Sequence, residues 1–148
     1  MTYDRNNVFA RILRGELPCI KVFEDAATLA FLDIMPQSDG HTLVLPREHA
    51  VTLLDLTPEA ASACILTTKR VAAAVQRAVG APGLLISQFN GEAAGQTVPH
   101  VHFHIIPRFP GLKLKAHGRE RGDPDRLEQI AARILSELDA GRAREVGT

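Results

Sequence analysis

The stretch that decides the fold of this 148-residue chain is Pro99-His100-Val101-His102-Phe103-His104-Ile105-Ile106-Pro107. Successive side chains of a β-strand point to opposite faces of the sheet, so a strand over residues 100–106 would place the three histidines on one face. Val101, Phe103 and Ile105 would then lie on the other face, where their burial fixes the register. Three neighbouring imidazolium ions would repel one another, so most of these histidines must be neutral at pH 7 and available as bases, nucleophiles or metal ligands.

Chance and metal binding are the alternatives to a catalytic role for the three histidines. The chain has six histidines in all, so three of them at alternate positions of a solvent-facing strand would be an improbable accident. A metal site is the serious alternative, because His-x-His on a strand supplies two good ligands. Such sites usually add a carboxylate or a thiolate, and no acidic residue lies within seven positions of His100. The histidines alone leave metal binding and metal-free catalysis both open.

Outward from this stretch, the remaining patterns predict a small α+β domain. Further strands are expected over residues 19–23, 28–32, 41–45 and 84–89, with a short N-terminal helix capped by Asn6 or Asn7. A long helix should run from its cap at Thr57 to Gly80, with Ile65 on its buried stripe. A last helix should follow Asp123-Pro124. We therefore expect a five-stranded antiparallel sheet with a long helix, a short N-terminal helix and a C-terminal helical extension.

Composition narrows the classes of function. The 17 basic and 17 acidic residues cancel, so we expect no nucleic-acid partner. Residues 1–7 are polar, and no apolar run approaches the ~18 residues that span a bilayer, so we expect no signal peptide, no membrane partner and a cytoplasmic location. Cys19 and Cys64 are far apart in the chain, and we expect both to be buried free thiols.

The histidine segment and several upstream motifs resemble the histidine-triad (HIT) family. Residues 95–108 are similar to the family signature, and the other matching motifs occur in the family's order. These motifs are Phe9-Ala10-Arg11-Ile12, Gly15-Glu16-Leu17-Pro18, Ala30-Phe31-Leu32-Asp33 with Pro36, and Gly40-His41-Thr42-Leu43-Val44-Leu45-Pro46-Arg47-Glu48-His49. The resemblance covers roughly residues 6 to 108 and implies a HIT domain over residues 1–108, with residues 109–148 as a connector and a helix packed on it.

The resemblance implies a hydrolase that cleaves a nucleotide at its α-phosphate through a covalent nucleotidyl-histidine intermediate. His102 would be the nucleophile, because imidazole attacks phosphorus well and, once phosphorylated, leaves well. His104 would hydrogen-bond the phosphate or the leaving group. His100 and His41 would orient the nucleophile and tune its protonation.

The same resemblance assigns residues to the substrate, which we expect to be a purine nucleotide. Asp33 would accept hydrogen bonds from the ribose hydroxyls. Phe9, Ile34 and Leu43 would sandwich the base, although core packing explains each apolar residue, taken singly, as well or better. The phosphate would receive hydrogen bonds from the glycine-bearing loop or its neighbouring strand, through Asn90, Gly95, Gln96 and Thr97.

Departures from the family pattern carry information. Many family members bind structural zinc through a C-x-x-C pair near the first helix, and the matching positions here are Asn7 and Ala10. We therefore expect no metal and no cofactor. The third histidine is His104, where the transferase branch has glutamine, so hydrolysis is favoured over nucleotidyl transfer. The front half resembles the phosphoramidate-hydrolysing branch, whereas Gly95-Gln96-Thr97, Pro107-Arg108 and the C-terminal extension favour the dinucleoside polyphosphate hydrolases.

Two questions of biological role stay open at this point. A purine-nucleotide-binding regulatory module with only slow hydrolysis would carry the same residues, and measured turnover would distinguish it from an enzyme. A homodimer is expected, because a five-stranded sheet leaves two edges to cover and the long helix has alanines beyond one stripe. In the family, this helix and the following strand, here residues 84–89, form the dimer contact.

Overall fold

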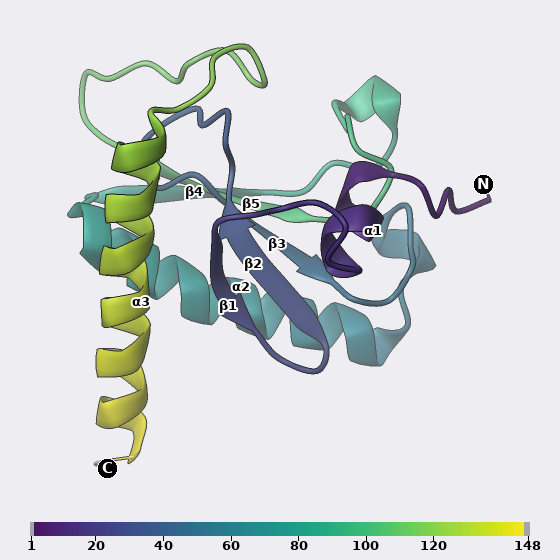
Figure 1. Ribbon diagram of the computed structural model, residues 1–148, viewed down its shortest axis with the longest axis horizontal. Helices are drawn as coiled ribbons and strands as arrows, with labels where there is room; N and C mark the ends of the chain where they lie inside the picture. The colour runs from purple at the N-terminus through teal and green to yellow at the C-terminus, as the bar shows by residue number, and fades with distance from the viewer. Residues whose placement is uncertain (1, 147–148) are drawn as a thin grey trace.

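One antiparallel sheet organises the part of the chain that the computed structural model describes, residues 2–146 (Figure 1). Its five strands lie in the order β1-β2-β3-β5-β4. Their bounds are β1 Lys21–Glu24, β2 Thr28–Leu32, β3 Thr42–Pro46, β4 Gly83–Ser87 and β5 Phe103–Arg108. Three α-helices, α1 Val8–Leu13, α2 Pro58–Val79 and α3 Pro124–Val146, and two 3₁₀ turns, η1 Leu53–Asp55 and η2 Glu92–Ala94, complete these residues. The predicted α+β class is confirmed; residues 1 and 147–148, at the ends of the two predicted ranges, lie outside the description.

The two faces of the sheet are covered differently. Alternate residues of β2 divide between them: Ala30 and Leu32 pack toward α2 and α3, whereas Leu29 and Phe31 pack with Phe9 of α1. Helix α3 contacts both α2 and β1, so the C-terminal residues complete the core on the first face. The second face carries the short helix α1 and loops (Figure 1).

Helix α2 begins and ends as its sequence predicts. The Thr57 hydroxyl accepts a hydrogen bond from the Ala60 backbone N–H, a cap typically worth about 1 kcal/mol. Gly80 ends the helix with φ +65°, a left-handed conformation that costs glycine little. The prediction for Ile65 is wrong, since this side chain is 47% exposed beside Leu66, which is 65% exposed. Helix α2 therefore has a second apolar face toward solvent.

Strand β5 begins at Phe103, so the predicted strand over residues 100–106 is wrong at its start. Phe103 pairs with Val44 of β3, and His104 pairs with both Leu43 and Ser87. Before Phe103 the chain is not paired with a neighbouring strand. The Val101 N–H donates to the Ala50 carbonyl, and the His100 ring hydrogen-bonds the carbonyl of Pro46 at the end of β3. His100 and His102 thus lie in the loop that enters the strand.

The other predicted features agree with the structure in part. Asn7 caps α1, with its Oδ1 accepting from the Ala10 N–H at 2.8 Å. Cys64 is a buried free thiol, whereas Cys19 is only half-buried. Within residues 2–146, no helix combines the length and the apolar character needed to cross a membrane.

Candidate active site

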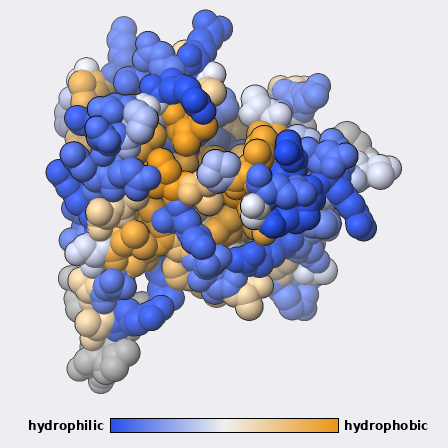
Figure 2. Space-filling view, viewed as in Figure 1, coloured by the Kyte–Doolittle hydropathy of each residue, from blue (hydrophilic) through white to orange (hydrophobic). Residues whose placement is uncertain are grey.

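A pocket of about 480 Å³ opens on the sheet face that carries α1, between that helix, the end of β2 and the connector that follows β5. Figure 2 shows apolar surface gathered on the middle of the face in view, with hydrophilic residues around it. The volume suits a small-molecule ligand such as a nucleotide. Its apolar lining includes Val8, Phe9, Ile12, Leu17, Phe31, Ile34 and Leu43, and its polar lining includes Asp33, Thr97, His102, His104, His117 and Arg121.

The tautomer of His102 follows from one hydrogen bond. Its Nδ1 lies 2.7 Å from the backbone carbonyl oxygen of His100, and a carbonyl can only accept. Nδ1 therefore carries the proton, and the lone pair of a neutral His102 ring is on Nε2. Because His102 lines the pocket, this arrangement suits a nucleophile.

His100 lies behind His102 and does not line the pocket. Its Nε2 donates to the Pro46 carbonyl at 2.8 Å, so in the neutral ring Nδ1 is an acceptor. The Tyr3 hydroxyl supplies the matching donor at 2.6 Å from Nδ1. The expectation of three imidazoles displayed together is thus wrong for His100, which is fully buried, while the His102 and His104 ring centroids are 4.9 Å apart.

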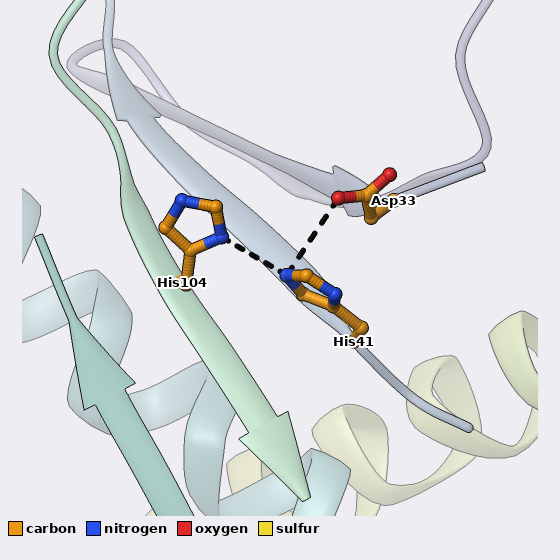
Figure 3. Close-up of side chains that lie close together, drawn as sticks. All are labelled: Asp33, His41 and His104. Carbon is orange, nitrogen blue, oxygen red and sulfur yellow. Dashed lines mark hydrogen bonds and ion pairs between the residues drawn. The ribbon is translucent and has the colours of Figure 1, made fainter. Parts of the chain in front are cut away.

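His41 sets the tautomer of His104. The Gln37 backbone N–H donates to His41 Nδ1 at 3.0 Å, so the neutral His41 ring carries its proton on Nε2. That proton points to His104 Nδ1 at 2.9 Å, as the dashed line in Figure 3 shows. His104 must then hold its own proton on Nε2, where it can donate to a bound ligand. Asp33 Oδ2 lies 3.6 Å from His41 Nε2 on the other side.

The pKa values of four histidines are lowered, those of His41, His100, His102 and His104. Burial is the largest cause, and it brings the pKa of His41 and of His104 to about 3 and that of His100 to about 4. Burial lowers the pKa of His102 as well. The expected neutral state at pH 7 agrees with these shifts, but repulsion between the rings is the smaller cause and desolvation the larger. A neutral His102 has a nucleophilic lone pair without any deprotonation step.

The fold brings a carboxylate to the histidines from a distant part of the chain. One possible ligand atom each from Asp33, His41 and His104 lies within 4.8 Å of the others, which is close enough to hold a metal ion. Asp33, which is far from His100 in the sequence, is thus an acidic neighbour of His41 and His104 in the fold. The 2.9 Å separation of the two ring nitrogens fits an N–H···N hydrogen bond, whereas two nitrogens on one tetrahedral zinc ion would lie roughly 3.3 Å apart.

Two predicted phosphate donors have their side chains engaged elsewhere. The Gln96 amide nitrogen donates to the carbonyls of Val51 and Val98, and its oxygen accepts from the Gly91 N–H. The Asn90 amide accepts from the Leu53 N–H and pairs with the side chain of Gln88. These two residues hold the loop in shape instead of presenting donors to the pocket.

The remaining predicted substrate residues lie in or beside the pocket. Thr97, Asp33, Phe9, Ile34 and Leu43 all line it, and Ile34 is 39% exposed. Phe9 and Leu43 are also buried in the small apolar cluster of this face, so core packing and ligand contact are compatible for them. Gly95 has φ +105°, which favours glycine, and a side chain there would approach the Phe89 ring.

Sequence reasoning missed His117, which lies in the connector. Its ring centroid is 5.6 Å from that of His104 and 6.5 Å from that of His41, and it lines the pocket. Hydrogen bonds from Lys115 N to Gln37 O and from Gly122 N to Ile34 O fasten the connector here. No spacing or motif points to His117, because only the folded connector brings it to the triad.

Comparison with known proteins gives the site its context. Residues 14–111 match the family model described as the HIT domain. The chain belongs to the HIT family. HIT relatives include an adenosine 5'-monophosphoramidase of Schizosaccharomyces pombe, 44% identical over 101 residues that cover 68% of this chain and 73% of that protein. An adenylylsulfatase of Arabidopsis thaliana is 36% identical over 135 residues, covering 91% of this chain and 68% of that protein.

A solved HIT structure bears on the question of metal. The zinc-bound histidine triad family protein from Mycobacterium smegmatis has a TM-score of 0.83 to this chain at 37% identity, covering 94% of this chain and 97% of that one. Here the two positions of the family's C-x-x-C pair cannot supply thiolates. The Asn7 amide oxygen caps α1 and its amide nitrogen donates to the Asp4 carbonyl, and the Ala10 side chain has no ligand atom. Asn7 and Ala10 of this HIT domain therefore do not fit a zinc site built on a C-x-x-C pair.

Proposed function

We propose that this HIT protein hydrolyses nucleotides at the α-phosphate through a covalent nucleotidyl-histidine intermediate on His102. The observation that carries the proposal is the hydrogen bond from His102 Nδ1 to the His100 carbonyl, which leaves the Nε2 lone pair for a ligand in the pocket. The phosphoramidase and adenylylsulfatase relatives support it.

The proposed reaction has two displacements. First, His102 Nε2 attacks the α-phosphorus, a P–N bond forms, and the bond from phosphorus to the leaving group breaks with its electron pair going to the leaving atom. Water then attacks the same phosphorus and forms a P–O bond, the P–N bond breaks with its electron pair returning to His102 Nε2, and the proton lost by the water passes to solvent. His104 Nε2–H donates a hydrogen bond to the phosphate or the leaving atom, in the tautomer set by His41.

The substrate class we propose is a purine nucleoside phosphoramidate or a dinucleoside polyphosphate. The test is a steady-state kinetic comparison of adenosine phosphoramidate, adenylyl sulfate and diadenosine polyphosphates at one enzyme concentration. Rapid turnover of at least one of them supports the proposal. Tight binding of AMP with slow turnover of every substrate would favour a nucleotide-binding regulatory module.

Asp33 is proposed to bind the ribose hydroxyls. Its Oδ1 accepts from the Met35 N–H, while Oδ2 lies at the pocket beside His41. In the Asp33→Ala variant, we expect AMP binding to weaken by about 10- to 100-fold but binding of 2',3'-dideoxy-AMP to change by less than about threefold, because only ribose uses the carboxylate. Isothermal titration of both ligands measures the difference, and equal losses for the two would make Asp33 a structural residue only.

The proposed chemistry predicts that no metal is required. Because His102 and His104 act through nitrogen lone pairs and protons, kcat should be unchanged after exhaustive dialysis against EDTA. The purified protein is assayed before and after dialysis, with metal content followed by plasma emission spectroscopy. Stoichiometric zinc whose removal abolishes activity would instead assign the Asp33, His41 and His104 cluster to a metal.

We also propose a twofold homodimer through α2 and β4. Strand β4 is at one edge of the sheet, and Leu85 and Ile86 are each 41% exposed there, while α2 exposes Ile65 and Leu66. Exposed apolar side chains on an unpaired edge strand are typical of an interface. The C-terminal residues 109–148 are proposed to belong to each subunit's own domain.

The dimer is tested by sedimentation equilibrium at micromolar concentration. The wild type should have twice the mass of one chain, and Ile86→Lys should shift it toward the monomer, because a buried unpaired charge at the interface is costly. Leu112→Lys is the matched control, an exposed leucine of the connector that should leave the mass unchanged. A monomeric wild type, or a dimeric Ile86→Lys variant, contradicts the proposed interface.

A further inference from the structure

We propose that Tyr3 is a positioning residue, whose hydroxyl holds His100 in the tautomer and place on which the orientation of His102 depends. The inference rests on the proposed role of His102 as nucleophile. It concerns an N-terminal residue that neither lines the pocket nor belongs to the family motifs.

Tyr3 is held by two histidines at once. Its hydroxyl lies 2.6 Å from His100 Nδ1, and its ring stacks on that of His49, with centroids 4.6 Å apart and an interplanar angle of 10°. The same ring meets the edge of His100 at 5.6 Å and 70°. Partial burial raises the pKa of the Tyr3 hydroxyl, so the group stays protonated and can donate. His49 thus fixes where the ring lies, and the hydroxyl is aimed at one nitrogen of His100.

The direction of each hydrogen bond at His100 follows from the Pro46 carbonyl, which can only accept. Pro46 presents a carbonyl to His100 Nε2, so the ring donates there and must accept at Nδ1. His100 is fully buried, and without the Tyr3 hydroxyl its Nδ1 would have no partner among the contacts that the structure describes. A buried unpaired acceptor is unfavourable, so the ring would gain freedom to change tautomer or turn.

The backbone of His100 links this arrangement to the reacting atom. The His100 carbonyl is the acceptor that fixes the proton of His102 on Nδ1 at 2.7 Å. His100 therefore accepts two hydrogen bonds, one from the Tyr3 hydroxyl at its side-chain Nδ1 and one from His102 Nδ1 at its backbone carbonyl. Displacement of the His100 ring would move that carbonyl, and the lone pair of His102 Nε2 would lose its alignment toward the pocket.

The location of Tyr3 explains how this chain keeps a rigid corner without thiolates. Asn7 and Ala10 occupy the positions at which, by the family resemblance, many HIT proteins have the zinc-binding C-x-x-C pair. Here a hydroxyl and an aromatic stack occupy this corner beside His100. The N-terminal segment contacts the first histidine of the triad through the Tyr3 hydroxyl.

The test compares Tyr3→Phe, which keeps the stacked ring but removes the hydroxyl, with the wild type. Long-range ¹H–¹⁵N NMR of the imidazoles should show wild-type His100 as a single Nε2–H tautomer with a hydrogen-bonded Nδ1. In Tyr3→Phe the Nδ1 resonance should move toward that of a free lone pair. We expect kcat to fall about tenfold or more with KM changed less than about twofold, as for residues that orient a reacting group from behind.

The matched control is His49→Phe, which keeps an aromatic partner for the Tyr3 ring and leaves the hydroxyl in place. It should retain both the His100 signature and kcat. An unchanged His100 spectrum in Tyr3→Phe, or a changed spectrum with wild-type kcat, overturns the proposal. The NMR signature needs no turnover, so an inactive wild type would contradict the proposed function while still testing the contact between Tyr3 and His100.

Discussion

Replacing His102 with alanine is expected to leave a folded protein that binds AMP but turns over its best substrate at least about 10⁴-fold more slowly. The alanine variant lacks the Nε2 lone pair that we propose as the nucleophile. The loss should fall on kcat, because the proposed nucleoside contacts are made by the apolar lining and Asp33 and not by His102.

Steady-state kinetics and titration with AMP separate the two effects in the His102→Ala variant. The matched control is His117→Ala, which removes another imidazole from the lining of the same pocket. We expect that control to lose less than about tenfold in kcat. Comparable losses in the two variants, or residual activity of His102→Ala near the wild-type level, would mean that His102 is not the nucleophile.

Acid is expected to unfold the protein steeply between pH 6.5 and about pH 4. His41, His100 and His104 have folded-state pKa values of about 3, about 4 and about 3, against 6.5 in an exposed chain. Below pH 6.5 the unfolded chain therefore binds protons at these histidines and the folded protein does not. The free energy of unfolding is largest above pH 6.5 and decreases as the pH falls. Each histidine contributes about 1.4 kcal/mol per pH unit, and the three together roughly 4 kcal/mol per pH unit. An ordinary domain has a free energy of unfolding of about 5–15 kcal/mol. With this slope, a domain in the middle of that range would reach zero stability at about pH 4.

Urea unfolding at a series of pH values measures this slope. The variant His104→Gln should be less steep by about 1.4 kcal/mol per pH unit, because it removes one buried proton acceptor. A wild-type stability that is flat between pH 6.5 and 5 would show that the histidines are not buried in neutral form.

Much of the fold was accessible to sequence reasoning, since local rules determine it. Helix α2 is bounded by Thr57 and Gly80 because a hydroxyl cap and a left-handed glycine act within a few residues. The predicted strand over residues 28–32 is observed as β2, because a short apolar run beside turn residues favours a strand. The start of β5 could not be predicted in this way. It depends on the carbonyls of Pro46 and Ala50, which belong to segments more than 45 positions earlier.

The resemblance supplied the residue types of the candidate site, but not the contacts between those residues. His102, His104 and Asp33 were expected from the resemblance, yet nothing in the sequence states that Asp33 lies beside His41 or that His100 faces away from the pocket. Gln96 and Asn90 carry donors that would suit a phosphate, and only the fold reveals that carbonyls and amides of neighbouring loops already engage them. His117 and Tyr3 come from segments without any motif. Long-range contacts decide all of these assignments.

The central claim is tested most directly by locating the covalent intermediate. Enzyme and a slowly hydrolysed adenylyl substrate are mixed, quenched in alkali within the first turnover to preserve the P–N bond, digested, and sequenced by tandem mass spectrometry. We predict an adenylyl group on the peptide that contains residues 100–104, attached to His102 and absent from the His102→Ala variant. An adduct on any other histidine, or wild-type turnover with no adduct at any time in the burst, would contradict the account.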